Sequence, residues 1–318
     1  MSVRPLLLVT LLSLNLAAET RLETASRLLT SGRPAEARAV LEDVLRSNPA
    51  NVEALELLGR VHLREREPKK ARESAKRILE LDPKRASAHC LVAMAASSEI
   101  GDANVFRKMS LSGEIRSSFA KALELDPRNR TAREGLFQFY RQAPSVAGGG
   151  LDKAGALAEE SVQADPALGH AMKARLHAAR KETGKALAEY LLSVASEPPY
   201  VPALNEVGYL ELELKQPDAA LGHFRRQVEL APANANAHDS LGDGLMVKGL
   251  LDEAIAAYRE AARLDPGFAA AVFHLGQALE RKGRIGEAVE QYRKAAGMSP
   301  SDPQVRQAKE RLSTLGLS

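Results

Sequence analysis

Residues 235–266 read ANAHDSLGDGLMVKGLLDEAIAAYREAARLDP, and residues 269–300 read AAAVFHLGQALERKGRIGEAVEQYRKAAGMSP. The two segments share one pattern, because Pro232, Pro266 and Pro300 are 34 residues apart. If each proline is given position 32 of a 34-residue unit, both units have Leu-Gly at positions 7 and 8, Gly at 15, Ala at 20, Tyr at 24 and Ala at 27. A fixed period with the same residue types at the same positions indicates internal repeats.

Each unit is predicted to form two helices joined by a tight turn. Apolar residues recur three and four positions apart on both sides of the glycine at position 15, which is Gly249 in one unit and Gly283 in the next. Small residues at positions 8, 20 and 27 allow helices to approach closely, and the proline at position 32 stops the second helix. One hairpin cannot bury its apolar face alone, so the units are expected to stack around a continuous core.

The same pattern can be followed along most of the chain. Its units end near Pro49, Pro83, Pro127, Pro166, Pro198, Pro232, Pro266 and Pro300. The third unit has ten extra residues, around 100–114, which predict a lengthened second helix or an ordered excursion. The fourth has five extra residues, within 142–152, and the fifth is two residues short. We therefore expect one repeat domain over residues 19–302, followed by a capping helix in residues 303–318.

This pattern resembles that of the tetratricopeptide repeat. The resemblance extends from the first unit to the last, although other residues replace the tryptophan usual at position 4, namely Leu55, Leu204, His238 and Val272. The resemblance implies an all-α fold, a right-handed α-solenoid of about eight helical hairpins with a C-terminal capping helix. It also implies a scaffold that binds other molecules.

The first 18 residues are predicted to be a secretory signal peptide. Arg4 supplies a positive charge, a mostly apolar run extends from Leu6 to Leu16, and two alanines precede Glu19. The apolar run is too short for a comfortable membrane span. An uncleaved anchor or a buried first helix is the alternative. We expect cleavage before Glu19, a periplasmic or secreted protein, and no integral membrane span after cleavage.

We expect a protein partner and no nucleic acid, and the composition agrees with the second expectation. Charged residues make up 27% of the chain, but the formal net charge is only +3, so the overall charge gives no reason to invoke nucleic acid or an anionic membrane surface. Cys90 is the only cysteine, which excludes a disulfide within the chain.

No residue pattern in the sequence predicts catalysis. The seven histidines are scattered over different repeat positions, and only His170 and His177 could share a helix face, which is too few ligands for a zinc site. Cys90 has no identifiable base beside it. The three glycines at 148–150 could hold an anion at a helix start, but a flexible turn explains them better. We expect no catalytic residue, no cofactor and no metal, and therefore no enzyme.

The predicted binding residues follow from helix geometry. Positions 4, 7, 8 and 11 face the packing, so positions 2, 5, 9 and 12 form the opposite face, which lines a concave groove in the family that the chain resembles. In the last three units the predicted contacts on this face are Asn205, Tyr209, Asn236, Asp239, Asp243, Phe273 and Gln277. Tyr209 and Phe273 are expected to be aromatic anchors; alternatively, they contact the adjacent repeat. The same face of the earlier units offers Glu56, Arg60, Glu134, Gln138 and Arg141.

The expected function is that of a non-enzymatic scaffold in the cell envelope, which binds a segment of a partner protein in the groove. The alternative is an accessory subunit of an envelope machine for polysaccharide or lipid export or assembly, which would contact a non-protein polymer.

Overall fold

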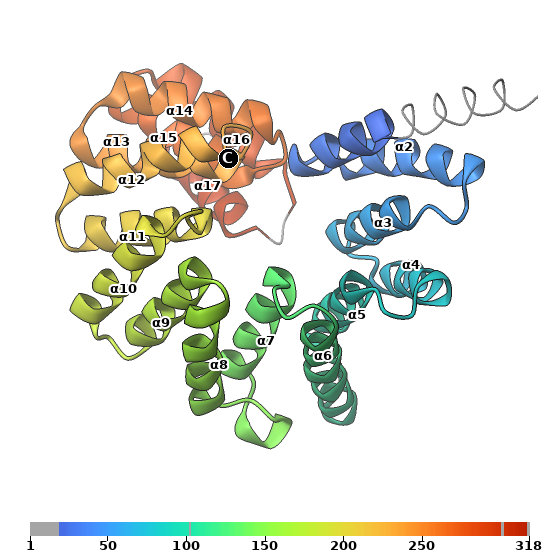
Figure 1. Cartoon of the computed structure of the whole chain (residues 1–318). Coiled ribbons are helices and arrows are strands. Elements are labelled where there is room, and N and C mark those ends of the chain that lie inside the picture. The colour runs from blue at the N-terminus through green and yellow to red at the C-terminus, as the bar shows by residue number, and fades with distance from the viewer. Residues whose placement is uncertain (1–18, 102, 300–301, 317–318) are drawn as a thin grey trace, which may run out of the picture. The chain divides into compact units, whose positions relative to one another are not determined.

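The computed structural model describes residues 19–101, 103–299 and 302–316, and all of its regular secondary structure is helical (Figure 1). The predicted signal peptide, residues 1–18, lies outside the described residues, as do Pro300 and the last two residues of the chain. The helices pair in chain order as antiparallel hairpins, so the all-α fold of stacked hairpins predicted from the sequence is confirmed.

The described residues divide into two compact units, and the division lies inside α9, between Met172 and Lys173. In the first unit, residues 19–29 are helical, and Ala25 and Leu29 pack with Ala37 and Leu41 of the next helix. The labelled helices of this unit are α2 (Pro34–Ser47), α3 (Val52–Arg64), α4 (Pro68–Leu81), α5 (Ala86–Glu99), α6 (Val105–Leu125), α7 (Arg130–Gln142), the 3₁₀ helix η1 (Ser145–Ala147) and α8 (Leu151–Ala164).

The second unit follows the same plan. Its helices are α9 (Pro166–Ala179), of which only the later part belongs here, α10 (Thr183–Ala195), α11 (Val201–Glu213), α12 (Pro217–Leu230), α13 (Ala235–Lys248), α14 (Leu251–Leu264), α15 (Ala269–Arg281), α16 (Ile285–Ala296) and α17 (Pro303–Thr314). The final helix, α17, packs on both α15 and α16 and buries Val305, Ala308 and Leu312. It therefore covers the apolar face that the last hairpin would otherwise expose.

The irregular units are explained by local structure. The extra residues of the third unit lengthen its second helix, because α6 has 21 residues. Those of the fourth unit form the loop between α7 and α8, where η1 ends at Gly148 in the left-handed conformation, with φ of 92°. In the fifth unit α9 begins at Pro166 itself, so the usual turn residues after the proline are missing. None of the described helices is both long enough and apolar enough to span a membrane.

An aromatic ring explains the glycine at position 8. A β-carbon built on Gly276 would lie 2.6 Å from Cε1 of Tyr292, which is completely buried. Gly242 faces Tyr258 in the same way one repeat earlier. The glycine therefore makes room for the residue at position 24 of the same hairpin, which holds the two helices together.

The turn at position 15 requires a left-handed backbone. Gly249 and Gly283 adopt it with φ of 75° and 78°. Three other hairpins place a basic residue there, with φ of 59° at Arg66 and 60° at Lys181 and Lys215. Left-handed backbone costs such residues energy because Cβ crowds the neighbouring carbonyl oxygen.

Ion pairs join successive hairpins at repeated positions. Lys248 at position 14 contacts Asp218, at position 18 of the preceding unit, with Nζ 2.7 Å from Oδ1. Lys282 and Asp252 form the same pair one repeat later. On the second helices, Arg259 at position 25 lies 3.6 Å from Glu287, at position 19 of the following unit. These exposed pairs add little stability each, but they match neighbouring hairpins in register.

Candidate partner-binding sites

The residues predicted to bind a partner lie on α11, α13 and α15, which pack against one another in the second unit. The structure separates them into three groups. A hydrogen-bonded network contains Asn205, Tyr209, Asp239 and Asp243, the surface contains Asn236 and Gln277, and the core contains Phe273.

Tyr209 links two neighbouring repeats. Its ring packs edge-to-face on Phe224, with centroids 5.3 Å apart. Its hydroxyl donates to Oδ2 of Asp243 at 2.7 Å, and nearby Ser240 donates to Oδ1 of Asn205 at 2.5 Å. Tyr209 therefore contacts the adjacent repeat, as the alternative interpretation expects, although its side chain is only partly buried.

Asp243 and Asp239 extend the network to the last hairpin. Oδ1 of Asp243 accepts a hydrogen bond of 2.7 Å from the hydroxyl of Tyr258. Asp239 is only 4% exposed, and its Oδ1 lies 3.0 Å from Nδ1 of His274. The same imidazole nitrogen is 3.6 Å from Oδ1 of Asp243. One imidazole therefore faces two carboxylates that lie four residues apart on α13.

Burial and mutual charge set the protonation of these groups. Burial raises the pKa of Asp239, and the negative charge of Asp243 acts in the same direction. Burial alone would lower the pKa of His274, but the hydrogen bond to Asp239 and the two carboxylate charges outweigh it and raise that pKa. Burial and the charge of Asp243 also raise the pKa of Tyr209 and Tyr258, so both phenols remain protonated donors at neutral pH.

Phe273 is not available as the aromatic anchor that the sequence predicts. It is 5% exposed, and its ring packs on Tyr292 with centroids 5.7 Å apart. Position 5 of this unit therefore belongs to the hydrophobic core. The helical pattern places positions 5 and 9 on one face, but it does not say how far the neighbouring hairpin covers that face.

Three members of the network were missed from the sequence: Ser240, Tyr258 and His274. The repeat pattern places Tyr258 at position 24 but does not predict a contact for its hydroxyl group. His274 was treated as a scattered histidine. A usable signal existed, because His274 lies 35 residues after Asp239, one repeat and one position further.

In the first unit the corresponding face contains a cavity of about 270 Å³. It is formed by α3, α5 and the start of α7. The lining combines polar and apolar side chains, namely Glu56, Arg60, Ser87, Cys90, Leu91, Met94, Asn129 and Thr131. Glu56 and Arg60 stand at positions 5 and 9, so this cavity lies on the face that the sequence assigned to binding.

The charged groups of this cavity differ in their availability. Glu56 already accepts hydrogen bonds from Nε of Arg85 and Oγ of Ser87, each at 2.6 Å. Arg60 is exposed and forms no ion pair with any described residue. Burial raises the pKa of the Cys90 thiol to about 12, so this cysteine is not a thiolate nucleophile at neutral pH. The cavity therefore offers a guanidinium group beside apolar and neutral polar surface.

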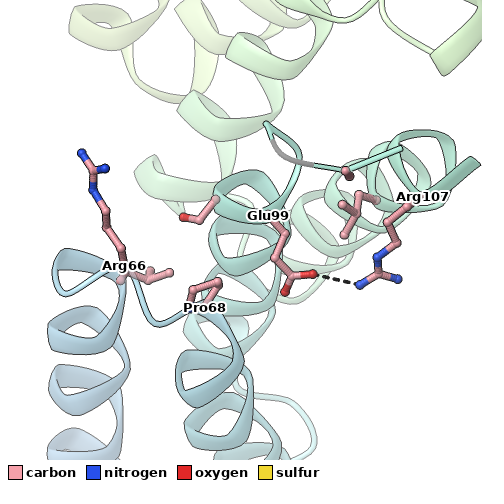
Figure 2. Close-up of a pocket in the computed structure, with 8 residues that line it drawn as sticks. Arg66, Pro68, Glu99 and Arg107 are labelled. Carbon is pink, nitrogen blue, oxygen red and sulfur yellow. Dashed lines mark hydrogen bonds and ion pairs between the residues drawn. The ribbon is translucent and has the colours of Figure 1, made fainter. Parts of the chain in front are cut away.

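A second cavity of the first unit, of about 690 Å³, lies between the turn after α3 and the start of α6 (Figure 2). Glu99 lies at its wall and accepts from Arg72 at 2.7 Å and from Arg107 at 2.9 Å. Burial alone would raise the pKa of Glu99, but these two arginines lower it. Figure 2 shows Arg107 turned toward Glu99, while Arg66 points away from both. The carboxylate is thus already neutralised, and the sequence did not predict this cavity.

The tetratricopeptide repeat model matches residues 22–86 and 240–303. A search of curated protein sequences gave no significant match.

Solved structures with the same fold cover most of the chain. The yeast Tom70 structure matches 90% of this chain with a TM-score of 0.63 and 19% identity, and the match covers 59% of that chain. The Cut9–Hcn1 hetero-tetramer of the APC/C matches 91% with a TM-score of 0.54 and 18% identity, covering 54% of that chain. A thermophilic tetratricopeptide repeat protein of Thermus thermophilus, TTC0263, matches 61% with a TM-score of 0.52 and 20% identity, covering 99% of that chain. The chain thus spans little more than half of the Tom70 and Cut9 chains, and at these identities the likeness concerns the fold alone.

Proposed function

The chain is built from tetratricopeptide repeats, and we propose that it is a non-enzymatic scaffold that binds an extended segment of a partner protein on the face of its first helices. The cavity between α3, α5 and α7 is the observation that carries this proposal. An extended segment offers backbone amides, side chains and carboxylates, and the cavity has a complementary group for each. Leu91 and Met94 offer apolar contact, Asn129 and Thr131 offer polar contact, and Arg60 offers charge.

Arg60 gives this binding mode a preferred ligand chemistry. A guanidinium group that pairs with no acidic side chain among the described residues can donate two parallel hydrogen bonds to a carboxylate. We therefore expect the bound segment to carry an Asp, a Glu or a free C-terminal carboxylate near Met94. In the second unit, taken by itself, the exposed Asn236 and Gln277 are proposed contacts on its first helices, whereas Phe273 is left out because it is buried.

We also propose that the protein acts in the cell envelope. The support is the order of Arg4, the apolar run and the two alanines before Glu19.

Site-specific photo-crosslinking in the native host tests the binding face. A photoreactive phenylalanine analogue at Thr131, at the edge of the cavity, is expected to give a discrete protein adduct, and Arg60→Glu should abolish that adduct. The matched control is the same analogue at Ser117, a small exposed residue on the second helix α6. Equal adducts at both sites would remove the support for this face. An adduct that carries a glycan or lipid instead of a protein would favour the polymer-export alternative.

A further inference from the structure

We propose that Asp239, Asp243 and His274 bind a divalent transition-metal ion, with Zn²⁺ as the expected occupant. One ligand atom from each residue can be chosen so that all three lie within 4.8 Å of one another. Nδ1 of His274 is 3.0 Å from Oδ1 of Asp239 and 3.6 Å from Oδ1 of Asp243. In a tetrahedral zinc site with bonds of about 2.0–2.1 Å, neighbouring ligand atoms are about 3.3 Å apart. The separations around this imidazole therefore need only small adjustments.

The charge of the cluster is not balanced by the chain. Among the described residues, no lysine or arginine forms an ion pair with Asp239 or Asp243. Asp239 is 96% buried, and within the described part of the chain its Oδ1 faces His274, whereas its Oδ2 has no protein partner and keeps some access to solvent. Two carboxylates that face a single imidazole keep a net negative charge even when that imidazole is protonated, which is unfavourable in a largely buried place. A bound divalent cation would supply both the missing charge and a partner for the second oxygen.

The surroundings hold the ligands in place. Hydroxyl groups of Tyr209 and Tyr258 donate to the two oxygens of Asp243, each at 2.7 Å, so that its carboxylate is oriented from both sides. Such contacts around a metal ligand fix its geometry and increase its affinity. The nitrogen ligand disfavours Mg²⁺ and Ca²⁺, which prefer oxygen ligands, and favours a metal such as Zn²⁺.

A second cluster of the chain provides a contrast. His62, Glu65 and Glu67 also bring three ligand atoms together. There, however, Arg38 lies 3.1 Å from Glu65, and Lys70 lies 2.9 Å from Glu67. Lysine and arginine already occupy the position of the cation, so this cluster is not proposed as a metal site and serves as an internal control.

Zinc binding by the full chain, without an affinity tag and stripped with EDTA, tests the proposal. Isothermal titration with ZnCl₂ should give one equivalent per chain, and zinc should raise the melting temperature. Asp243→Asn and His274→Gln should weaken binding by more than about tenfold and remove the thermal shift. His62→Gln should leave both unchanged, and MgCl₂ should not compete.

Two results would overturn the proposal: no one-to-one zinc complex with the parent chain, or a folded Asp243→Asn or His274→Gln variant that binds zinc as tightly as the parent. Circular dichroism establishes that each variant is folded. If His274→Gln is not folded, the zinc affinity of Asp243→Asn is used instead, because that substitution keeps the size of the side chain. The partner-binding face of the first unit shares no residue with this cluster, so either proposal can fail without the other.

Discussion

At position 15, where the turn of the hairpin requires a positive φ, several units of this chain lack the glycine of the repeat pattern. Position 15 takes a left-handed conformation in the turn, and glycine meets this demand in Gly249 and Gly283. Arg66, Lys181 and Lys215 adopt the same conformation with a β-carbon. Their strain is local and does not change the plan of the hairpin.

Lys215→Gly is therefore expected to stabilise the protein. Relief of the left-handed strain is worth about 1–2 kcal/mol, and the greater freedom of glycine in the unfolded chain takes back about 0.4–1 kcal/mol. The net gain in unfolding free energy should be roughly 0.5–1 kcal/mol. Urea unfolding measures it. As a control, Glu213→Gly, at an exposed residue of helix α11, should destabilise by about 0.5–1 kcal/mol; stabilisation by both changes would contradict the explanation.

At the scale of the element, each hairpin depends on the fit between position 8 of its first helix and position 24 of its second. Tyr258 and Tyr292 are buried against Gly242 and Gly276. The sequence correctly predicted small residues at close contacts, but it could not identify the contacting atoms, because a repeat period does not specify side-chain direction.

Gly242→Ala should destabilise the second unit by about 1–3 kcal/mol, because the new methyl group overlaps a ring that has no free space around it. Thermal or urea unfolding measures the loss. Gly222→Ala on α12 is the matched control, since a β-carbon there meets no atom within 4 Å. That change should be neutral or stabilise by about 0.5–1 kcal/mol, as expected for alanine in a helix. Equal destabilisation by both would rule out the ring contact as the cause.

At the scale of the whole molecule, the sequence could predict most of the fold because the residue pattern that specifies one hairpin recurs in successive units. The candidate sites were harder. Positions 5 and 9 hold Asn205 and Tyr209 in one unit, Asp239 and Asp243 in the next, and Phe273 and Gln277 in the last. These pairs differ in burial, since coverage depends on the neighbouring hairpin. The metal-ligand cluster also crosses two repeats, so no single unit contains its signal.

The full-length chain is expected to lose residues 1–18 on export. The apolar run and the alanine pair predict cleavage before Glu19. Intact mass spectrometry of the protein from its native compartment measures the N-terminus. A mass that retains Met1 to Ala18 would reject cleavage, and the same species in a membrane fraction would support an uncleaved anchor.

The ion pairs between hairpins affect how easily such a chain can gain repeats by gene duplication. The unit that ends at Pro266 contains both residue types of each kind of pair. Lys248 pairs with the preceding hairpin, and Asp252 pairs with the following one. In the same way Glu253 pairs with the preceding hairpin, and Arg259 pairs with the following one. A tandem gene duplication of this unit would place its own lysine against its own aspartate, and its own arginine against its own glutamate. The copy would thus join the array through an interface that already exists, and the array could lengthen without any new complementary surface.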